Sequence, residues 1–125
     1  SMLPASDYVT AQRIRQMMVR ETDELLAPYS AIIAPSRGSG ADLIDGPETP
    51  PATQSETTRR GAAMTRMANL TGLPGISIPC GFDEEEMPLG LHITGRAWDE
   101  QSVLDIAMAF QRETDFHRQR PGLRE

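Results

Sequence analysis

The sequence predicts an α/β domain in which a small mixed sheet is flanked by helices. Apolar residues recur at helical spacing in three stretches of the 125-residue chain, and short apolar runs bounded by Gly and Pro lie between these stretches. The resulting order is helix, strand, loop, helix, strand, strand, helix, which is typical of a layered α/β fold. A chain of this length is expected to form a single domain over residues 1–125.

The first helix is expected over residues 7–27, with Ser6 as its N-cap and Pro28 marking its end. The apolar residues at helical spacing, which should form its buried stripe, are Ala11, Ile14, Met18, Leu25 and Leu26. The apolar run that follows, residues 31–34, is short and bounded by polar and Pro residues. We interpret this run as a buried strand.

Residues 35–53 are rich in Gly and Pro and predict a long, flexible loop. The Gly-Ser-Gly stretch at 38–40 lacks the Gly-Lys-Ser/Thr that follows in a phosphate-binding loop, so we interpret it as part of a surface connection. Thr53 and Glu56 have the spacing of a capping box, which predicts a second helix that runs to about Leu70.

Gly72 is placed to adopt a left-handed turn after the second helix. Residues 76–80 then predict a strand, in which Pro79 indicates an edge position or a bulge. Residues 89–94 predict a third strand, and Asp99 is expected to cap the last helix. The apolar residues expected to form the buried stripe of this helix are Val103, Leu104, Ala107, Met108 and Phe110.

The composition narrows the classes of function. A net charge of −6 and a pI near 4.9 argue against direct binding of nucleic acid. No apolar run is long enough to cross a bilayer, so no membrane partner is expected. The single cysteine, Cys80, cannot form an internal disulfide, which favours a cytoplasmic location. All twelve basic residues are Arg, so a mechanism that needs a lysine amine cannot run from this chain alone.

Several isolated residues have a chemical interpretation and a plainer structural one. Cys80 and His92 could form a thiol–imidazole pair, but nothing in the sequence orients them, and a small buried cysteine with a strand histidine is the plainer interpretation. His92 and His117 lack the spacing of zinc ligands, so neither a metal nor another cofactor is expected. The carboxylates at 84–86 are expected to form a solvated turn.

Two Gly- and Pro-rich runs resemble the closing segment of amidase-signature enzymes. They are residues 69–82, NLTGLPGISIPCGF, and residues 87–95, MPLGLHITG. Members of this family typically carry Gln where this chain has His92. Residues 29–35 and 117–121 resemble two further segments of the family, so the resemblance covers nearly the whole chain. It implies the fold of the C-terminal part of these enzymes.

The resemblance implies that the intact parent is an amide hydrolase, or an amidotransferase similar to the A-subunit of the tRNA-dependent enzyme, acting on a small amide. Family members use a serine nucleophile, a second serine and a lysine. Both the lysine and the Gly-Ser-Ser-Gly-Gly signature are absent from this chain. We therefore expect a C-terminal lobe or fragment that is inactive without its N-terminal catalytic part. The alternative is a standalone interaction module that keeps the fold and has lost the chemistry.

One face of the second helix is the candidate substrate-binding surface. Ala62, Thr65, Arg66 and Asn69 lie at i, i+3, i+4 and i+7. The resemblance implies that this face lines the acyl pocket of an intact enzyme, although packing and capping are the plainer interpretation of each residue. The amidotransferase members of the family often carry an acid at the position of Ala62. Its absence favours a small or apolar amide over an ammonium-bearing substrate such as glutamine.

The apolar stripes of the first and last helices both need partner layers, and a chain of 125 residues buries only a lean core. A lobe separated from its N-terminal part would also expose strand edges, which readily pair with another chain. We therefore expect a homodimer or a domain swap as a way to cover these surfaces.

Overall fold

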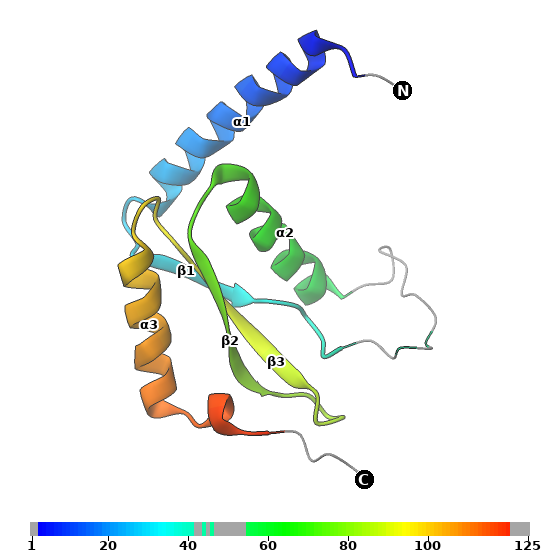
Figure 1. The fold of residues 1–125 in the computed structure, drawn as a ribbon, viewed down its shortest axis with the longest axis vertical. Helices are drawn as coiled ribbons and strands as arrows, with labels where there is room; N and C mark the ends of the chain where they lie inside the picture. The colour runs from blue at the N-terminus through cyan, green and yellow to red at the C-terminus, as the bar shows by residue number, and fades with distance from the viewer. Residues whose placement is uncertain (1–2, 42–43, 45, 47–54, 121–125) are drawn as a thin grey trace.

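The computed structural model describes residues 3–41, 44, 46 and 55–120. Its elements are α1 (Ala5–Leu26), β1 (Ala31–Pro35), α2 (Glu56–Thr71), β2 (Gly75–Phe82), β3 (Pro88–Gly95), α3 (Glu100–Glu113) and the short 3-10 helix η2 (Phe116–Arg118). Helix α3 lies on one side of the sheet and α2 on the other, while α1 extends beyond the sheet (Figure 1). This arrangement confirms the α/β class and the flanking helices.

The sheet has the order β1-β3-β2, and both pairings are antiparallel, where a mixed sheet was expected. The tight turn between β2 and β3 makes them a hairpin, which can only be antiparallel. Strand β2 lies at one edge, and its register shifts between Pro79 and Gly81. The expectation of an edge or a bulge at Pro79 is therefore confirmed on both counts, because a residue without an N–H is tolerated in such a position.

The core lies between α3 and the sheet. Its fully buried members are Ile78, Ile93, Val103 and Ala107. Full burial of an Ile or Val side chain contributes about 1.5–3 kcal/mol, and that of Ala107 contributes less. The expected stripe of α3 is correct at Val103, Ala107 and Phe110 but wrong at Leu104 and Met108, which are 47% and 49% exposed. These two residues follow buried ones directly, and one step around a helix is about 100° away from the sheet.

Helix α1 buries less of its apolar stripe than the sequence suggests. Only Thr22 and Leu26 are buried, whereas Ile14 and Leu25 are exposed. The physical reason is the position of the helix, since most of its length runs past the end of the sheet and has no layer to pack against (Figure 1). None of the helices in the described part of the chain is long and apolar enough to cross a membrane.

Two of the expected helix starts are displaced. The N-cap of α1 is Pro4 rather than Ser6, because a proline before the first turn loses no helical hydrogen bond. Helix α2 is capped by Ser55, whose Oγ accepts a hydrogen bond from the backbone N–H of Thr58 at 3.1 Å. The expected capping box requires Glu56 to be the third residue of the helix, but Glu56 is the first. Thr53, the other residue of the expected box, lies outside the described residues.

Two other caps are confirmed. Gly72 ends α2 with φ +78°, a left-handed conformation that glycine adopts without the penalty of a Cβ. Asp99 caps α3, and its Oδ1 accepts a hydrogen bond from the backbone N–H of Ser102 at 3.3 Å. An N-cap such as Asp99 contributes about 1 kcal/mol. Gly72 marks where the chain turns from α2 toward β2.

Helix α2 is held close to both neighbouring elements. A Cβ on Gly61 would lie 2.5 Å from the carbonyl oxygen of Pro35, so the helix approaches the end of β1 more closely than a larger residue would permit. At the other end of α2, Arg15 of α1 donates from Nε to the carbonyl oxygen of Leu70 at 2.7 Å. These two contacts fix the orientation of α2 over the sheet.

The described beginning of the long loop runs along the molecule instead of leaving it. Strand β1 includes Pro35, so the loop begins at Ser36, whose N–H donates to the carbonyl oxygen of Gly90 at 2.8 Å. Gly38 lies against Thr58 at the start of α2. Most of residues 41–54 lie outside the described part, and the flexibility of the 35–53 loop stays a prediction.

Candidate functional site

The four residues of the candidate substrate-binding surface lie on α2. Ala62 and Thr65 are half-buried, while Arg66 and Asn69 are exposed. The hydroxyl of Thr65 donates to the carbonyl oxygen of Gly61 at 3.2 Å, so this group is used within the helix. The exposed polar side chains on this face are therefore Arg66 and Asn69. A role for the four residues in substrate binding stays a prediction.

A pair of serine hydroxyls spans the central strand. Ser36 Oγ and Ser77 Oγ are 2.5 Å apart and share a hydrogen bond, although they come from opposite sides of β3. Gly90 of β3 makes this contact possible because it has no side chain. A Cβ at this position would lie 2.8 Å from Ser36 Oγ and 2.9 Å from Ser77 Oγ, which is too close. Sequence reasoning missed this pair. The available signal was a glycine inside a strand, which often marks a close approach.

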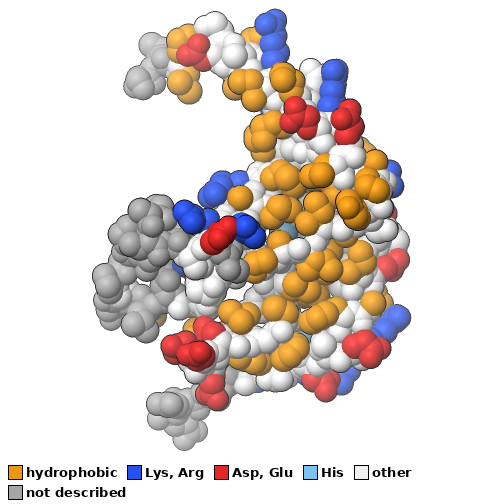
Figure 2. Space-filling model, turned by 180° about the vertical axis from the view of Figure 1, so that it is seen from behind, with side chains coloured by type: hydrophobic (Ala, Val, Ile, Leu, Met, Phe, Trp, Pro, Cys, Tyr) orange, Lys and Arg blue, Asp and Glu red, His pale blue; other side chains and the backbone are white. Residues whose placement is uncertain are grey.

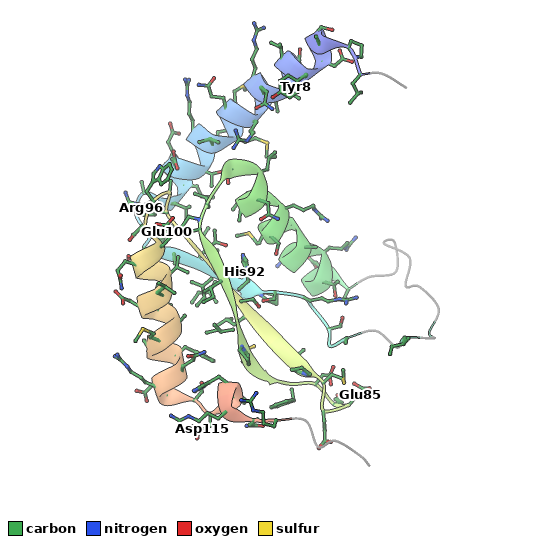
Figure 3. All side chains as sticks on the ribbon, in the orientation of Figure 1. Tyr8, Glu85, His92, Arg96, Glu100 and Asp115 are labelled. Atoms are coloured by element: carbon green, nitrogen blue, oxygen red, sulfur yellow. The ribbon has the colours of Figure 1, made fainter. Side chains whose placement is uncertain are left out.

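His92 lies next to this pair on the central strand, in register with Ala34 on one side and Ser77 on the other (Figure 3). A Cβ on Gly75 would lie 3.2 Å from His92 Nε2. Nε2 is buried without a hydrogen-bond partner in the described chain, as is the hydroxyl of Thr94 two residues further on. An unsatisfied buried group costs about 1–3 kcal/mol. Strand β3 thus carries two of the three buried side-chain atoms that have no hydrogen-bond partner within the described residues.

The geometry does not support catalysis by Cys80. Its thiol donates to the carbonyl oxygen of Leu89 at 3.6 Å, and no hydrogen bond joins it to His92 in the described part of the structure. Burial raises the pKa of the Cys80 thiol above its ordinary value. The neutral thiol is a weak nucleophile, so the structural interpretation of this cysteine is the better supported one.

The acidic residues form the turn of the β2–β3 hairpin. Glu84, Glu85 and Glu86 are exposed, and Glu85 lies at the tip (Figure 3). Asp83 stabilises the turn, since its Oδ1 accepts hydrogen bonds from the N–H groups of Glu85 at 3.1 Å and Met87 at 2.8 Å. Within the residues that the structure describes, no group of three or more His, Cys, Asp or Glu side chains is arranged to hold a metal ion.

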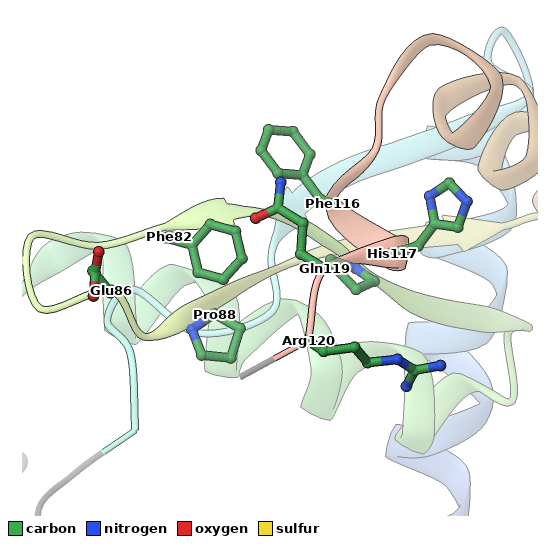
Figure 4. Close-up of a pocket in the computed structure, with 8 residues that line it drawn as sticks. Phe82, Glu86, Pro88, Phe116, His117, Gln119 and Arg120 are labelled. Atoms are coloured by element: carbon green, nitrogen blue, oxygen red, sulfur yellow. The ribbon is translucent and has the colours of Figure 1, made fainter. Parts of the chain in front are cut away.

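An open pocket of about 550 Å³ lies between the β2–β3 hairpin and the segment around η2 (Figure 4). Its apolar walls are Pro79, Phe82, Pro88 and Phe116. Its polar lining consists of Glu86, His117, Gln119 and Arg120. The four residues of the α2 face are not part of it. Sequence reasoning missed this pocket because its two halves are separated along the chain by β3 and α3.

The layered fold and the Gly- and Pro-rich frame of its strands together define the class of protein. The chain belongs to the amidase family, whose sequence model matches residues 2–104. That match covers α1, α2, the three strands and the start of α3. It therefore includes both the α2 face and the serine pair. The expected family is thereby confirmed.

Bacterial relatives share one name, the A-subunit of glutamyl-tRNA(Gln) amidotransferase. The chain is 35% identical over 116 residues to the protein of that name from Oceanobacillus iheyensis, and 37% identical over 116 residues to that from Halalkalibacterium halodurans. Each alignment covers 93% of this chain and 23% of the relative. The chain thus spans about a quarter of the length of the curated relatives it matches.

Two solved structures resemble this fold. The glutamyl-tRNA(Gln) amidotransferase A-subunit of Thermotoga maritima matches with a TM-score of 0.68 and 30% identity, over 86% of this chain and 22% of that one. The 6-aminohexanoate cyclic dimer hydrolase matches with a TM-score of 0.78 and 18% identity, over 95% of this chain and 26% of that one. At 18% identity the second likeness concerns the fold alone.

Proposed function

We propose that this chain is the C-terminal part of an amide hydrolase or amidotransferase and that it has no catalytic activity alone. One observation carries the proposal: a chain of the amidase family that spans 23% of its relatives contains neither a lysine nor the Gly-Ser-Ser-Gly-Gly signature. A serine hydroxyl is a weak nucleophile without an activating base, so the chemistry has to come from a separate N-terminal part.

In the joined enzyme, the role of the chain is to supply one wall of the acyl pocket. The close contact at Gly61 and the hydrogen bond from Arg15 hold α2 at both ends, which leaves the Arg66 and Asn69 side exposed and in a fixed orientation. Rigid placement of such a surface favours a precise pocket. Ala62 offers no charge partner for an ammonium group, which supports a small or apolar amide as the substrate.

Ammonia release from simple aliphatic and aromatic amides tests this proposal. The chain alone is expected to give no turnover above the buffer background, because no activated nucleophile is present. The Cys80→Ala variant is the matched control for the thiol. Turnover that survives further purification and disappears in Cys80→Ala would contradict the proposal and assign catalysis to the cysteine.

A standalone interaction module is the second candidate function. It is favoured by the large apolar side chains that remain exposed, among them Ile33 on the edge strand β1 and Trp98 before α3. An upstream reading frame that encodes the serine signature and a lysine would favour the first proposal, the C-terminal part of an enzyme.

We propose a cytoplasmic location under both candidate functions, because the single Cys80 forms no disulfide.

A further inference from the structure

We propose that the pocket between the β2–β3 hairpin and the η2 segment binds a small carboxylate with an aromatic or aliphatic body. The volume of about 550 Å³ falls in the range of small-molecule sites, which are mostly apolar and carry a few polar groups that orient the ligand. This inference rests on residues outside the α2 face and does not depend on the proposed function.

The apolar walls are suited to a flat or extended hydrocarbon body. The rings of Phe82 and Phe116 have centroids 6.3 Å apart and an interplanar angle of 60°, which leaves a tilted aromatic surface toward the pocket. Phe82 is 41% exposed, a large apolar area for a residue at the end of a strand. Pro79 and Pro88 complete the walls with rigid rings. An aromatic ligand would cover this area and gain ring contacts.

The charges of the lining give the ligand a direction. Glu86 and Arg120 lie toward opposite ends of the pocket, with Phe82 and Pro88 between them (Figure 4). A carboxylate is attracted to the Arg120 end and repelled from the Glu86 end. The planar guanidinium matches a carboxylate with two parallel hydrogen bonds, which makes this end specific as well as attractive.

Two features indicate that the polar lining is available to a ligand. The neighbouring Arg118 is paired with Asp115 at 3.3 Å, whereas Arg120 takes part in no ion pair within the described residues. Gln119 and Arg120 are both exposed, so their polar groups are accessible to a ligand in the pocket.

Titration of the 125-residue chain with benzoate, followed in ¹H–¹⁵N spectra, tests this proposal. Saturable shifts are expected at the backbone amides of Phe82, Phe116 and Gln119. Benzamide, the neutral isostere, is expected to bind at least about tenfold more weakly, because it lacks the charge that pairs with Arg120. The probe 4-(aminomethyl)benzoate is expected to bind more tightly than benzoate, because its ammonium group adds a charge opposite to that of Glu86.

Three exposed residues provide variants that are expected to preserve the fold. Arg120→Gln is expected to raise the Kd of benzoate about tenfold or more. The matched control Arg112→Gln, on the exposed side of α3, is expected to leave the Kd unchanged. Glu86→Gln should remove the advantage of the amine-bearing probe and leave benzoate binding intact or stronger. Absence of saturable shifts, equal binding of benzamide and benzoate, or an unchanged Kd in Arg120→Gln would overturn the proposal.

Discussion

Replacing Gly61 with alanine is expected to destabilise the protein by about 1–3 kcal/mol, although alanine is the better helix former by about 1 kcal/mol. A Cβ at this position would lie 2.5 Å from the carbonyl oxygen of Pro35, and a backbone atom cannot move aside as a side chain can. Helix α2 would have to lift away from β1, which would also loosen the start of the long loop. Urea denaturation measures the change in the free energy of unfolding.

Ala63→Gly is the matched control for that experiment, because Ala63 is exposed on the same helix two residues further on. It is expected to lose only about 1 kcal/mol, the intrinsic cost of glycine in a helix. Glycine is thus expected to be preferred at position 61 and alanine at 63. A Gly61→Ala variant that is more stable than the wild type would show that α2 does not need this close approach.

The isolated chain is expected to self-associate through the edge of β1. Strand β1 is paired with β3 alone within the described sheet, so one row of its backbone groups has no strand partner. Ile33 is 56% exposed although it lies in register with the fully buried Ile93, because α3 packs over β2 and β3 and leaves β1 uncovered. Hydrophobic side chains gather on this side of the molecule (Figure 2). A two-fold pairing of β1 with its copy would cover both features.

Sedimentation equilibrium over a wide concentration range measures this association. The mass is expected to rise from 13.7 kDa toward about twice that value. Ile33→Glu should keep the protein monomeric. Leu70→Glu, the same kind of change at a residue that is 42% exposed on α2, should not affect the mass. A clean 13.7 kDa monomer at high concentration, with no binding of an apolar dye, would show that the chain covers its own core.

The parts of the fold that are predictable from sequence are those fixed by local backbone chemistry. Gly72, Pro79 and Asp99 each have a property that suits one kind of position, and each is found there. The extent of burial was less predictable. Ile14 has the correct helical spacing but is exposed, because spacing identifies an apolar face and not the layer that covers it.

The candidate sites were likewise predictable only where they depend on residues close together in the sequence. The four residues of the α2 face could be found from sequence because they lie on one helix, where a fixed spacing determines neighbours. The Ser36–Ser77 pair depends on the order of the strands and on the absence of a side chain at Gly90. The pocket beside Phe82 depends on where the chain returns after α3. Tertiary contacts of this kind have no local pattern that would reveal them.

The mass of the protein made from its native gene tests most directly whether this chain belongs to a larger enzyme. A product of about four times 13.7 kDa is expected, because 93% of this chain aligns with 23% of its relative, a ratio of about four. That product should contain the serine signature and a lysine, and should release ammonia from a small amide. A native product of 13.7 kDa, with no catalytic partner copurifying, would contradict the assignment to a larger enzyme and support the interaction module.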